Sequence, residues 1–277
     1  MPRDLLCVIQ SNDEPSAALS QTLAFVAGYN VNPTFVAVAP TPPPVLNFFG
    51  ISLVEGLIAD ANNKAAEMAN ATEAQVLDAG RQQGFTPAVL KQTESLAEIT
   101  ASIEKSARCF DLTIIDRLDD FLDPASAIFE TVLFGSGRPV LIATPTKKPV
   151  ERFRTAVLAW DGSPHATRVL SSALALFPDL KSISIFTAAR EGEESLVPAS
   201  EIAAHIQRHD IETDVVSLNV RGEDQHVGVL IAEHAGRKNA DLIVMGGYGH
   251  SRIREFILGG VTEYLSKVAP VPILLAH

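Results

Sequence analysis

Short apolar runs rich in β-branched residues alternate along the chain with longer segments of helical periodicity. The apolar runs occupy residues 4–10, 34–39, 88–91, 111–116, 155–160, 182–189, 214–220 and 241–246. The segments with helical periodicity occupy residues 16–28, 60–83, 95–108, 165–176, 199–209 and 226–238. Strands that are apolar throughout and alternate with helices are typical of a parallel sheet covered on both faces. The pattern therefore predicts an α/β fold.

The second half of the chain repeats the pattern of the first. The segment DLTII, which begins at Asp111, corresponds to DLIVM, which begins at Asp241. The last apolar segment of the first half, RPVLIAT with Pro139, corresponds to VPILLAH with Pro272. A repeat of this length is far longer than the unit of a solenoid, so we interpret it as a duplicated domain.

A short linker is predicted between the two copies. Residues 144–153 read TPTKKPVERF, where prolines and charged residues interrupt the apolar pattern. We place the domain boundary at this linker, which divides the chain into residues 1–148 and 149–277.

One run near the end of the chain, MGGYGHSRIREFILGGVT, has two clusters of glycines around a helix-forming stretch. The first cluster directly follows the apolar run 241–246, and ligands of parallel α/β sheets bind beyond the carboxyl ends of the strands. Gly260 is expected to cap the next helix, with Glu263 in the capping-box position. The free N–H groups of that helix would form an anion site. Taken alone, the glycines fit a phosphate site and a merely tight bend about equally well.

Two common phosphate-binding motifs are absent from the sequence. The chain has no G-x-x-x-x-G-K-[ST] string, so it has no P-loop of that type. The dinucleotide fingerprint G-x-G-x-x-G is also broken, because Gly247, Tyr248 and Gly249 are followed by His250, Ser251 and Arg252.

The spacing of three glycines resembles a known signature. Gly246, Gly249 and Gly259 form G-x2-G-x9-G, which resembles the ATP-binding signature of the universal stress protein family. The resemblance extends over both halves, so the whole chain resembles a tandem member of that family. It implies two Rossmann-like domains of the adenine nucleotide alpha hydrolase-like type, each with a five-stranded parallel sheet and helices on both faces.

The resemblance also implies an ATP site in residues 149–277. Asp161 matches the acidic residue that contacts the nucleoside, and Gly260 stands where the family often has a hydroxyl residue. The loss of one hydrogen bond from such a hydroxyl would weaken the site by roughly 1.5–3 kcal/mol. The residues expected to bind the nucleotide are Ala159, Trp160, Asp161, Met245, Gly246, Tyr248, Gly249, Gly259, Gly260 and Val261. ATP, alone or with Mg²⁺, is the implied ligand.

The first half lacks this signature. Where DLIVM continues into GGYG, DLTII continues into DRLDDFLD, which places Asp116, Asp119, Asp120 and Asp123 where phosphates would lie. Like charges held close together repel each other, and the repulsion grows as water is excluded. We therefore predict that residues 1–148 form a degenerate domain that binds no nucleotide in this way.

Composition and charge exclude several other classes of protein. The net charge is −11, and neither half has the basic surface expected of a nucleic-acid binder. No apolar run reaches the roughly 18 residues that would indicate a membrane-spanning helix. Cys7 and Cys109 lie in apolar segments, and we interpret both as core residues of a protein in a reducing compartment. The expected location is the cytoplasm.

No catalytic residue and no metal site is predicted. His205 and His209 have the i, i+4 spacing of two metal ligands on one helix, but no third ligand lies nearby in the sequence. A solvated helix face is therefore the better interpretation.

The segment 40–57, PTPPPVLNFFGISLVEGL, is unusually apolar for a connection. Its prolines should prevent an early helix, while Phe48, Phe49, Ile51 and Leu53 could cover the core or an interface. Packing within the protomer and a flap that contacts a partner or lipid are the two alternatives.

Three functional classes follow from these observations. The favoured one is a stress-response regulator, not an enzyme, that binds ATP in its second domain. A slow ATPase and a scaffold without a nucleotide are the alternatives. Because family members commonly dimerise through their last strands, RPVLIAT and VPILLAH are expected to pair as an internal pseudo-dimer, and two chains could associate further into a homodimer.

Overall fold

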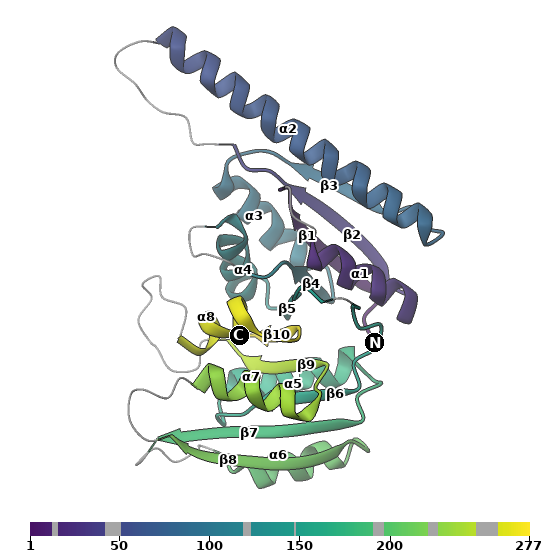
Figure 1. The fold of residues 1–277 in the computed structure, drawn as a ribbon, viewed down its shortest axis with the longest axis vertical. Helices are drawn as coiled ribbons and strands as arrows, with labels where there is room; N and C mark the ends of the chain where they lie inside the picture. The colour runs from purple at the N-terminus through teal and green to yellow at the C-terminus, as the bar shows by residue number, and fades with distance from the viewer. Residues whose placement is uncertain are drawn as a thin grey trace.

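The protein folds around one continuous sheet of ten strands, as its computed structural model shows (Figure 1). The structure describes residues 1–12, 16–41, 51–118, 123–146, 148–190, 197–220, 227–247 and 260–277. The strands lie in the order β3-β2-β1-β4-β5-β10-β9-β6-β7-β8. The first half of the chain therefore supplies one side of the sheet and the second half supplies the other.

The first half contributes five strands and four helices. They are β1 (Asp4–Gln10), α1 (Ala17–Gly28), β2 (Asn32–Val38), α2 (Ile51–Gln82), β3 (Ala88–Gln92), α3 (Leu96–Ala107), β4 (Leu112–Ile115), α4 (Pro124–Gly135) and β5 (Val140–Ile142). The second half repeats this succession. Its elements are β6 (Thr155–Ala159), α5 (Pro164–Leu176), β7 (Ser182–Arg190), α6 (Ala199–Gln207), β8 (Glu212–Val220), α7 (Val227–Lys238), β9 (Leu242–Gly246), α8 (Gly260–Val268) and β10 (Ile273–Ala276).

Within each half all strand pairs are parallel, as the apolar runs predicted. The two halves meet where β5 and β10 pair antiparallel, with Leu141 opposite Leu274. The pairing that we expected between RPVLIAT and VPILLAH is therefore observed. Its consequence is that the two five-stranded sheets are not separate, because the pairing joins them into one sheet of ten strands. The predicted boundary at residue 148 falls between β5 and β6.

Helices cover both faces of the sheet. Buried side chains of α1, α5 and α6, with Val76 of α2, belong to one apolar cluster, and those of α3, α4, α7 and α8 belong to the cluster on the opposite face. Several helices begin at a side-chain cap that accepts a hydrogen bond from the first turn. These caps are Ser16 of α1, Ser95 of α3, Asp123 of α4 and Ser163 of α5. In α3 the cap is a complete capping box with Glu98.

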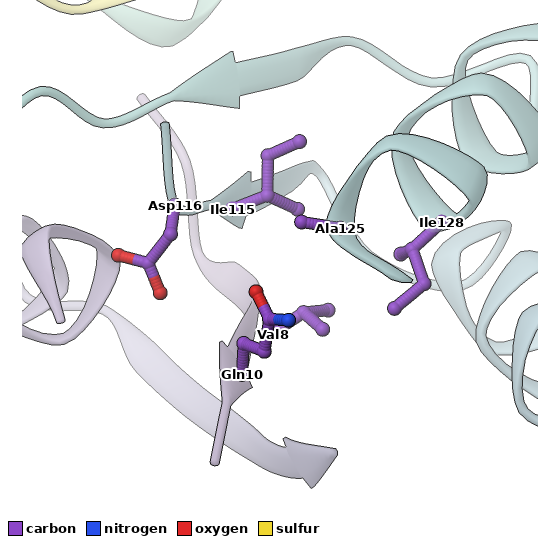
Figure 2. Close-up of a pocket in the computed structure, with 6 residues that line it drawn as sticks. All are labelled: Val8, Gln10, Ile115, Asp116, Ala125 and Ile128. Atoms are coloured by element: carbon purple, nitrogen blue, oxygen red, sulfur yellow. The ribbon is translucent and has the colours of Figure 1, made fainter. Parts of the chain in front are cut away.

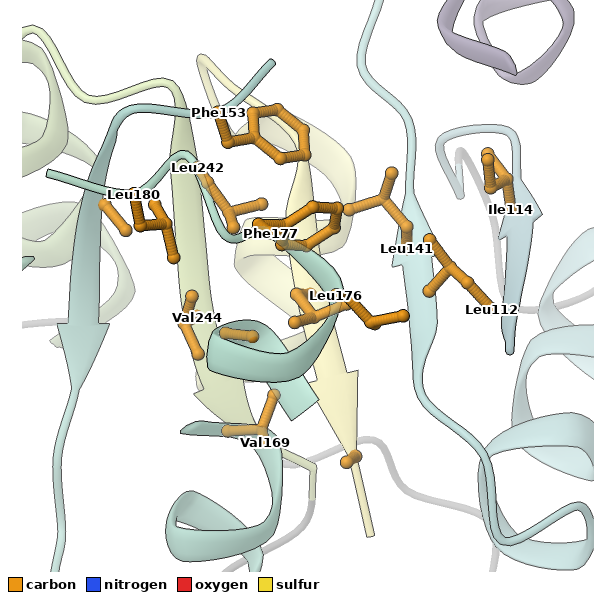
Figure 3. Close-up of a cluster of buried hydrophobic side chains, with 14 of the residues drawn as sticks. Leu112, Ile114, Leu141, Phe153, Val169, Leu176, Phe177, Leu180, Leu242 and Val244 are labelled. Carbon is orange, nitrogen blue, oxygen red and sulfur yellow. The ribbon is translucent and has the colours of Figure 1, made fainter. Parts of the chain in front are cut away.

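Three phenylalanines pack at the junction of the halves, and Figure 3 shows two of them, Phe153 and Phe177. The ring of Phe153, in the linker, lies 5.4 Å from that of Phe25 in α1 and 4.8 Å from that of Phe177 at the end of α5. All three side chains are fully buried. Leu141 of β5 and Leu242 of β9 belong to the same cluster, so one core extends continuously from the first half into the second.

Two expectations about individual residues are wrong. The helix expected at 60–83 begins nine positions earlier, at Ile51, so residues 51–57 of the apolar segment are helical and only 42–50 lie outside the described residues. Phe48 and Phe49 fall in that gap, and the side chains of Ile51 and Leu53 are also outside the description. Cys7 is buried as expected, but Cys109 is exposed, because the chain turns there between α3 and β4.

None of the helices that the structure describes combines the length and the apolarity needed to span a bilayer.

Candidate functional site

The carboxyl ends of β6 and β9 form the centre of the candidate site. These two strands are neighbours, with Ala159 opposite Met245, and the order of the strands reverses between them. In open parallel sheets such a reversal opens a crevice at the strand ends, because the helices on either side of it turn toward opposite faces. Asp161 follows β6, and Gly246 is the last residue of β9. The structure thus brings together two parts of the predicted site that lie far apart in the sequence.

Gly246 is needed because α5 approaches the end of β9. A Cβ at this position would lie 2.8 Å from the backbone nitrogen of Ala166 and 2.9 Å from the Cβ of His165. Contacts of that length with backbone atoms require the helix to move. The glycine therefore permits the N-terminus of α5, with its positive dipole end, to lie directly against the strand end.

The loop from β6 into α5 is held by two local hydrogen bonds. The carboxylate Oδ1 of Asp161 accepts a bond of 2.9 Å from the backbone N–H of Ser163. The hydroxyl of Ser163 in turn accepts a bond from the backbone N–H of Ala166, and Pro164 occupies the first position of the helix. Asp161 is half-buried, and its position at the strand end is fixed by this turn.

The apolar residues of the predicted site divide between the two faces of the sheet. Met245 is buried, and Ala159 and Val261 are partly buried against the same cluster. Trp160 belongs to the opposite cluster, where its side chain is only 4% exposed and its indole N–H donates to the carbonyl of Val197 over 3.1 Å. The indole ring of Trp160 is thus part of the core on one face, whereas Ala159, Met245 and Val261 belong to the apolar cluster on the other.

The start of α8 differs from the expectation. Gly260 is the first residue of the helix and not its cap, and the Glu263 carboxylate pairs with Lys267 at 3.1 Å. Because Gly260 is already helical, the helix begins one residue too early for the expected capping box, and Glu263 faces Lys267 one turn further along. Tyr248, Gly249 and Gly259 lie outside the described residues.

Two histidines that were not part of the predicted site lie beside Gly246. The ring of His165 stacks on that of His277, with centroids 4.2 Å apart and planes inclined by 19°. Within the described part of the chain, the buried Nδ1 atom of His165 has no hydrogen-bond partner. Burial lowers the pKa of His165, His277 and Arg168 lower it further, and Asp161 opposes the shift. No local pattern indicates this pair, because α5 and the end of β10 meet only in the folded chain.

The first half shows what occupies the equivalent position when the glycines are absent. The registers pair Val8 with Ile115 and Ala159 with Met245, so Asp116 is the counterpart of Gly246. The carboxylate of Asp116 accepts hydrogen bonds from the hydroxyl of Ser16 at 2.9 Å and from the backbone N–H of Ala18 at 2.8 Å. Here a side-chain anion therefore binds the N-terminus of α1.

The counterpart of Asp161 by the same registers is Gln10. Its amide donates a bond of 2.6 Å to Asp123, and the carboxylate of Asp123 also caps α4 by accepting from Ala125. Figure 2 shows Asp116 and Gln10 at this edge, with Ile128 of α4 across a small hollow. The hollow has a volume for water of about 10 Å³, which is room for about one molecule.

These contacts revise the reason why the first half should bind no phosphate. We expected the carboxylates of Asp116, Asp119, Asp120 and Asp123 to repel phosphates, and of these Asp119 and Asp120 lie outside the described residues. Asp116, however, is largely buried, and burial raises its pKa against the hydrogen bonds that oppose the shift. The position is therefore filled by the chain itself, and repulsion by Asp116 is a secondary effect.

A Ser-His-Asp group, which spacing did not reveal, lies on another part of the second half. The hydroxyl of Ser184 in β7 is 2.8 Å from Nε2 of His234 in α7 and 3.0 Å from the carboxylate of Asp214 in β8. The serine has one proton to donate, and the carboxylate takes it, so His234 must donate to Ser184 and cannot act as its base. Ser184 and His234 are buried, and we interpret the group as an anchor of α7 on the sheet.

This anchor predicts a loss of stability in acid. Burial lowers the pKa of His234 below its ordinary value of 6.5, and Lys238 and Arg237 lower it further against Asp214. Because the folded state disfavours the charged imidazole, its contribution is complete above pH 6.5 and is lost as the pH falls through the lowered pKa. Urea unfolding should therefore show that the free energy of unfolding falls between about pH 7 and about pH 5. The fall should be larger for the native protein than for a His234→Gln variant, whose side chain at this position does not titrate. An equal dependence of the unfolding free energy on pH in the two proteins would contradict this interpretation.

His205 lies exposed on α6 and His209 in the turn that follows it, with ring centroids 5.1 Å apart. Within the part of the chain that the structure describes, no group of three or more His, Cys, Asp or Glu side chains is placed to hold a metal ion.

Comparisons with known proteins agree with this fold. Residues 152–277 match the model of the universal stress protein family. The chain is 25% identical over 150 residues to the universal stress protein Slr1230 of Synechocystis, which covers 53% of this chain and 50% of that protein. It is 42% identical over 65 residues to the stress response protein NhaX of Bacillus subtilis, which covers 21% of this chain and 39% of that protein. The matched region thus spans half or less of each curated relative.

A solved structure resembles the whole chain. The crystal structure of a universal stress protein from Archaeoglobus fulgidus superposes with a TM-score of 0.68 at 17% identity, over 99% of this chain and 97% of that one. At this identity the likeness concerns the fold, and it covers both halves together.

Proposed function

Because residues 152–277 belong to the universal stress protein family, we propose that the second half of the chain binds ATP, as a nucleotide-dependent regulator of a stress response. The observation that carries the proposal is the contrast between two equivalent strand ends. At Gly246 the N-terminus of α5 lies against bare backbone, whereas at Asp116 a carboxylate of the chain already takes the N–H of α1. Among the described residues, a side chain from the neighbouring strand end binds the N-terminus of α1 but not that of α5.

The chemistry of the described residues suits a nucleoside triphosphate. Ala159, Met245 and Val261 provide apolar surface for a base, and Asp161 provides an acceptor for the ribose hydroxyls at the end of β6. The first turn of α8, which begins at Gly260, and the glycines before it would supply backbone N–H groups to the phosphates. Mg²⁺ would accompany the triphosphate and neutralise part of its charge.

Regulation is favoured over hydrolysis by the state of Asp161. A hydrolase needs a positioned base for the attacking water. Asp161 follows β6, where the nucleobase and not the phosphates would lie. Its carboxylate already accepts a hydrogen bond from the N–H of Ser163. We therefore assign it to binding.

Isothermal titration of the full chain with ATP, with and without Mg²⁺, tests the proposal. One site per chain is expected, and replacement of Gly249 and Gly259 by valine should remove it while the circular dichroism spectrum stays unchanged. Side chains at these positions would take the room that phosphates need against the backbone. Retained affinity in the double variant would refute the assignment of the glycines.

Two further results would point to the other functional classes. Release of phosphate from bound ATP at a rate above that of the glycine variant would indicate an ATPase. Failure of the native chain to bind ATP at all would leave a scaffold without a nucleotide.

A further inference from the structure

The antiparallel junction brings one helix of the first half to the candidate site of the second. Because β5 and β10 run in opposite directions, the residues before β5 lie next to the carboxyl end of β10. Those residues are the last turn of α4, including Leu133 and Phe134. The carboxyl ends of β9 and β10 are the edge of the sheet from which the glycine-rich segment departs.

Leu133 contacts the first turn of that segment directly. A Cβ on Gly247 would lie 2.8 Å from Cδ2 of Leu133, so the leucine side chain rests against the bare Cα of the glycine. Leu133 itself is buried. The contact leaves Gly247 no room to move toward α4.

The end of β10 holds both backbone groups of Gly247. Its N–H donates to the carbonyl of Ala276 over 3.0 Å. Its carbonyl lies 3.3 Å from Nδ1 of His277, which donates to it in the tautomer with the proton on that nitrogen. The turn that starts the glycine-rich segment is thus fixed by two hydrogen bonds and one apolar contact.

His277 is in turn held by rings from both halves. The ring of Phe134 meets it edge-on, with centroids 4.6 Å apart and planes at 75°, while His165 of α5 stacks on it. Phe134, His277 and His165 therefore form a continuous layer that runs from α4 to the N-terminus of α5, where Gly246 lies. The first half contributes the outer member of that layer.

We propose that α4 of the first half positions the start of the glycine-rich segment, so that the nucleotide affinity of the second half depends on Leu133 and on His277. This inference rests on the proposed function, because it names what holds that same site in place. Leu133, Phe134 and His277 are positioning residues and not direct ligands. Fixing a loop in its binding conformation raises affinity because less ordering remains to be done on binding.

Four variants of the full chain separate positioning from general stability. Leu133→Ala removes the contact with Gly247, and Ile128→Ala is its matched control, because Ile128 is equally buried on α4 but lines the hollow of the first half. His277→Phe keeps the stacked ring and removes the donor to Gly247. His277→Asn removes the ring and keeps a donor at the same position of the side chain.

ATP titration should show a rise in Kd of roughly 5- to 20-fold for Leu133→Ala and for His277→Phe. Ile128→Ala should leave the Kd unchanged, and His277→Asn should restore much of the affinity that His277→Phe loses. A Kd for Leu133→Ala no higher than that of Ile128→Ala would overturn the proposal. So would native affinity in His277→Phe.

Amide hydrogen exchange without nucleotide makes the test independent of ATP binding. The Gly247 amide should be protected in the native chain, should exchange faster in Leu133→Ala and His277→Phe, and should be unaffected in Ile128→Ala. Faster exchange without any change in Kd would refute a role in binding. If the native chain binds no ATP, the proposed function fails, and the exchange rates alone then decide whether α4 holds the turn.

Discussion

A Gly246→Val variant is expected to lose ATP binding by about 100-fold or more and to be less stable than the native chain. The valine Cβ would lie 2.8 Å from the backbone nitrogen of Ala166, so α5 must shift away from β9. Overpacking of this kind costs about 1–3 kcal/mol of folding free energy. Displacement of the α5 N-terminus also changes the site, where each lost hydrogen bond to a charged group costs roughly 1.5–3 kcal/mol of binding free energy.

The measurement is an ATP titration together with urea unfolding. Gly236→Val is the control, because nothing lies within 4 Å of a Cβ built at that helical glycine. Valine has a somewhat higher helix propensity than glycine, so the control should keep its stability or gain slightly, with ATP affinity unchanged. Native affinity in Gly246→Val would show that the close approach of α5 is not part of the site.

A Phe153→Ala variant is expected to lose about 3–5 kcal/mol of stability, the usual cost of removing a buried aromatic ring. The ring of Phe153 contacts Phe25 of the first half and Phe177 of the second, so its removal leaves a cavity at the junction. The total stability of a native protein is typically about 5–15 kcal/mol, so the variant would lose roughly a third of it or more.

Chemical denaturation followed by circular dichroism measures this loss. Phe153→Leu keeps most of the apolar volume and should cost clearly less than the alanine variant. A loss below about 1 kcal/mol for Phe153→Ala would mean that β5 and β10, and not the aromatic cluster, hold the halves together.

The two halves share a fold and differ in what meets the helix N-terminus at equivalent strand ends. Asp116 and Gly246 occupy equivalent ends of equivalent strands. The aspartate gives α1 an internal anion, whereas the glycine lets α5 pack directly against the end of β9. On our proposals the first half binds no nucleotide itself, and its α4 positions the turn at Gly247 in the second half.

The local sequence pattern predicted the strands well and the helices less well. The apolar runs placed all the strands that they predicted within about two residues of their observed positions, because a strand buried on both faces requires apolar residues along its whole length. The pattern missed the early start of α2, where residues 51–57 are helical although prolines precede them and Gly56 lies among them. It also missed α4, which caps on Asp123 in a stretch that we had interpreted only by its charge.

The sequence alone determined the α/β class, the duplication and the loss of glycines from the first half, since periodicity, repeat and composition are local properties of the chain. Only the tertiary structure decided what those features do. The antiparallel pairing of β5 with β10 brings Leu133 to Gly247, and the parallel register brings Asp116 to the N-terminus of α1. Contacts between residues so far apart depend on how strands pair and helices pack, and no spacing along the chain records them.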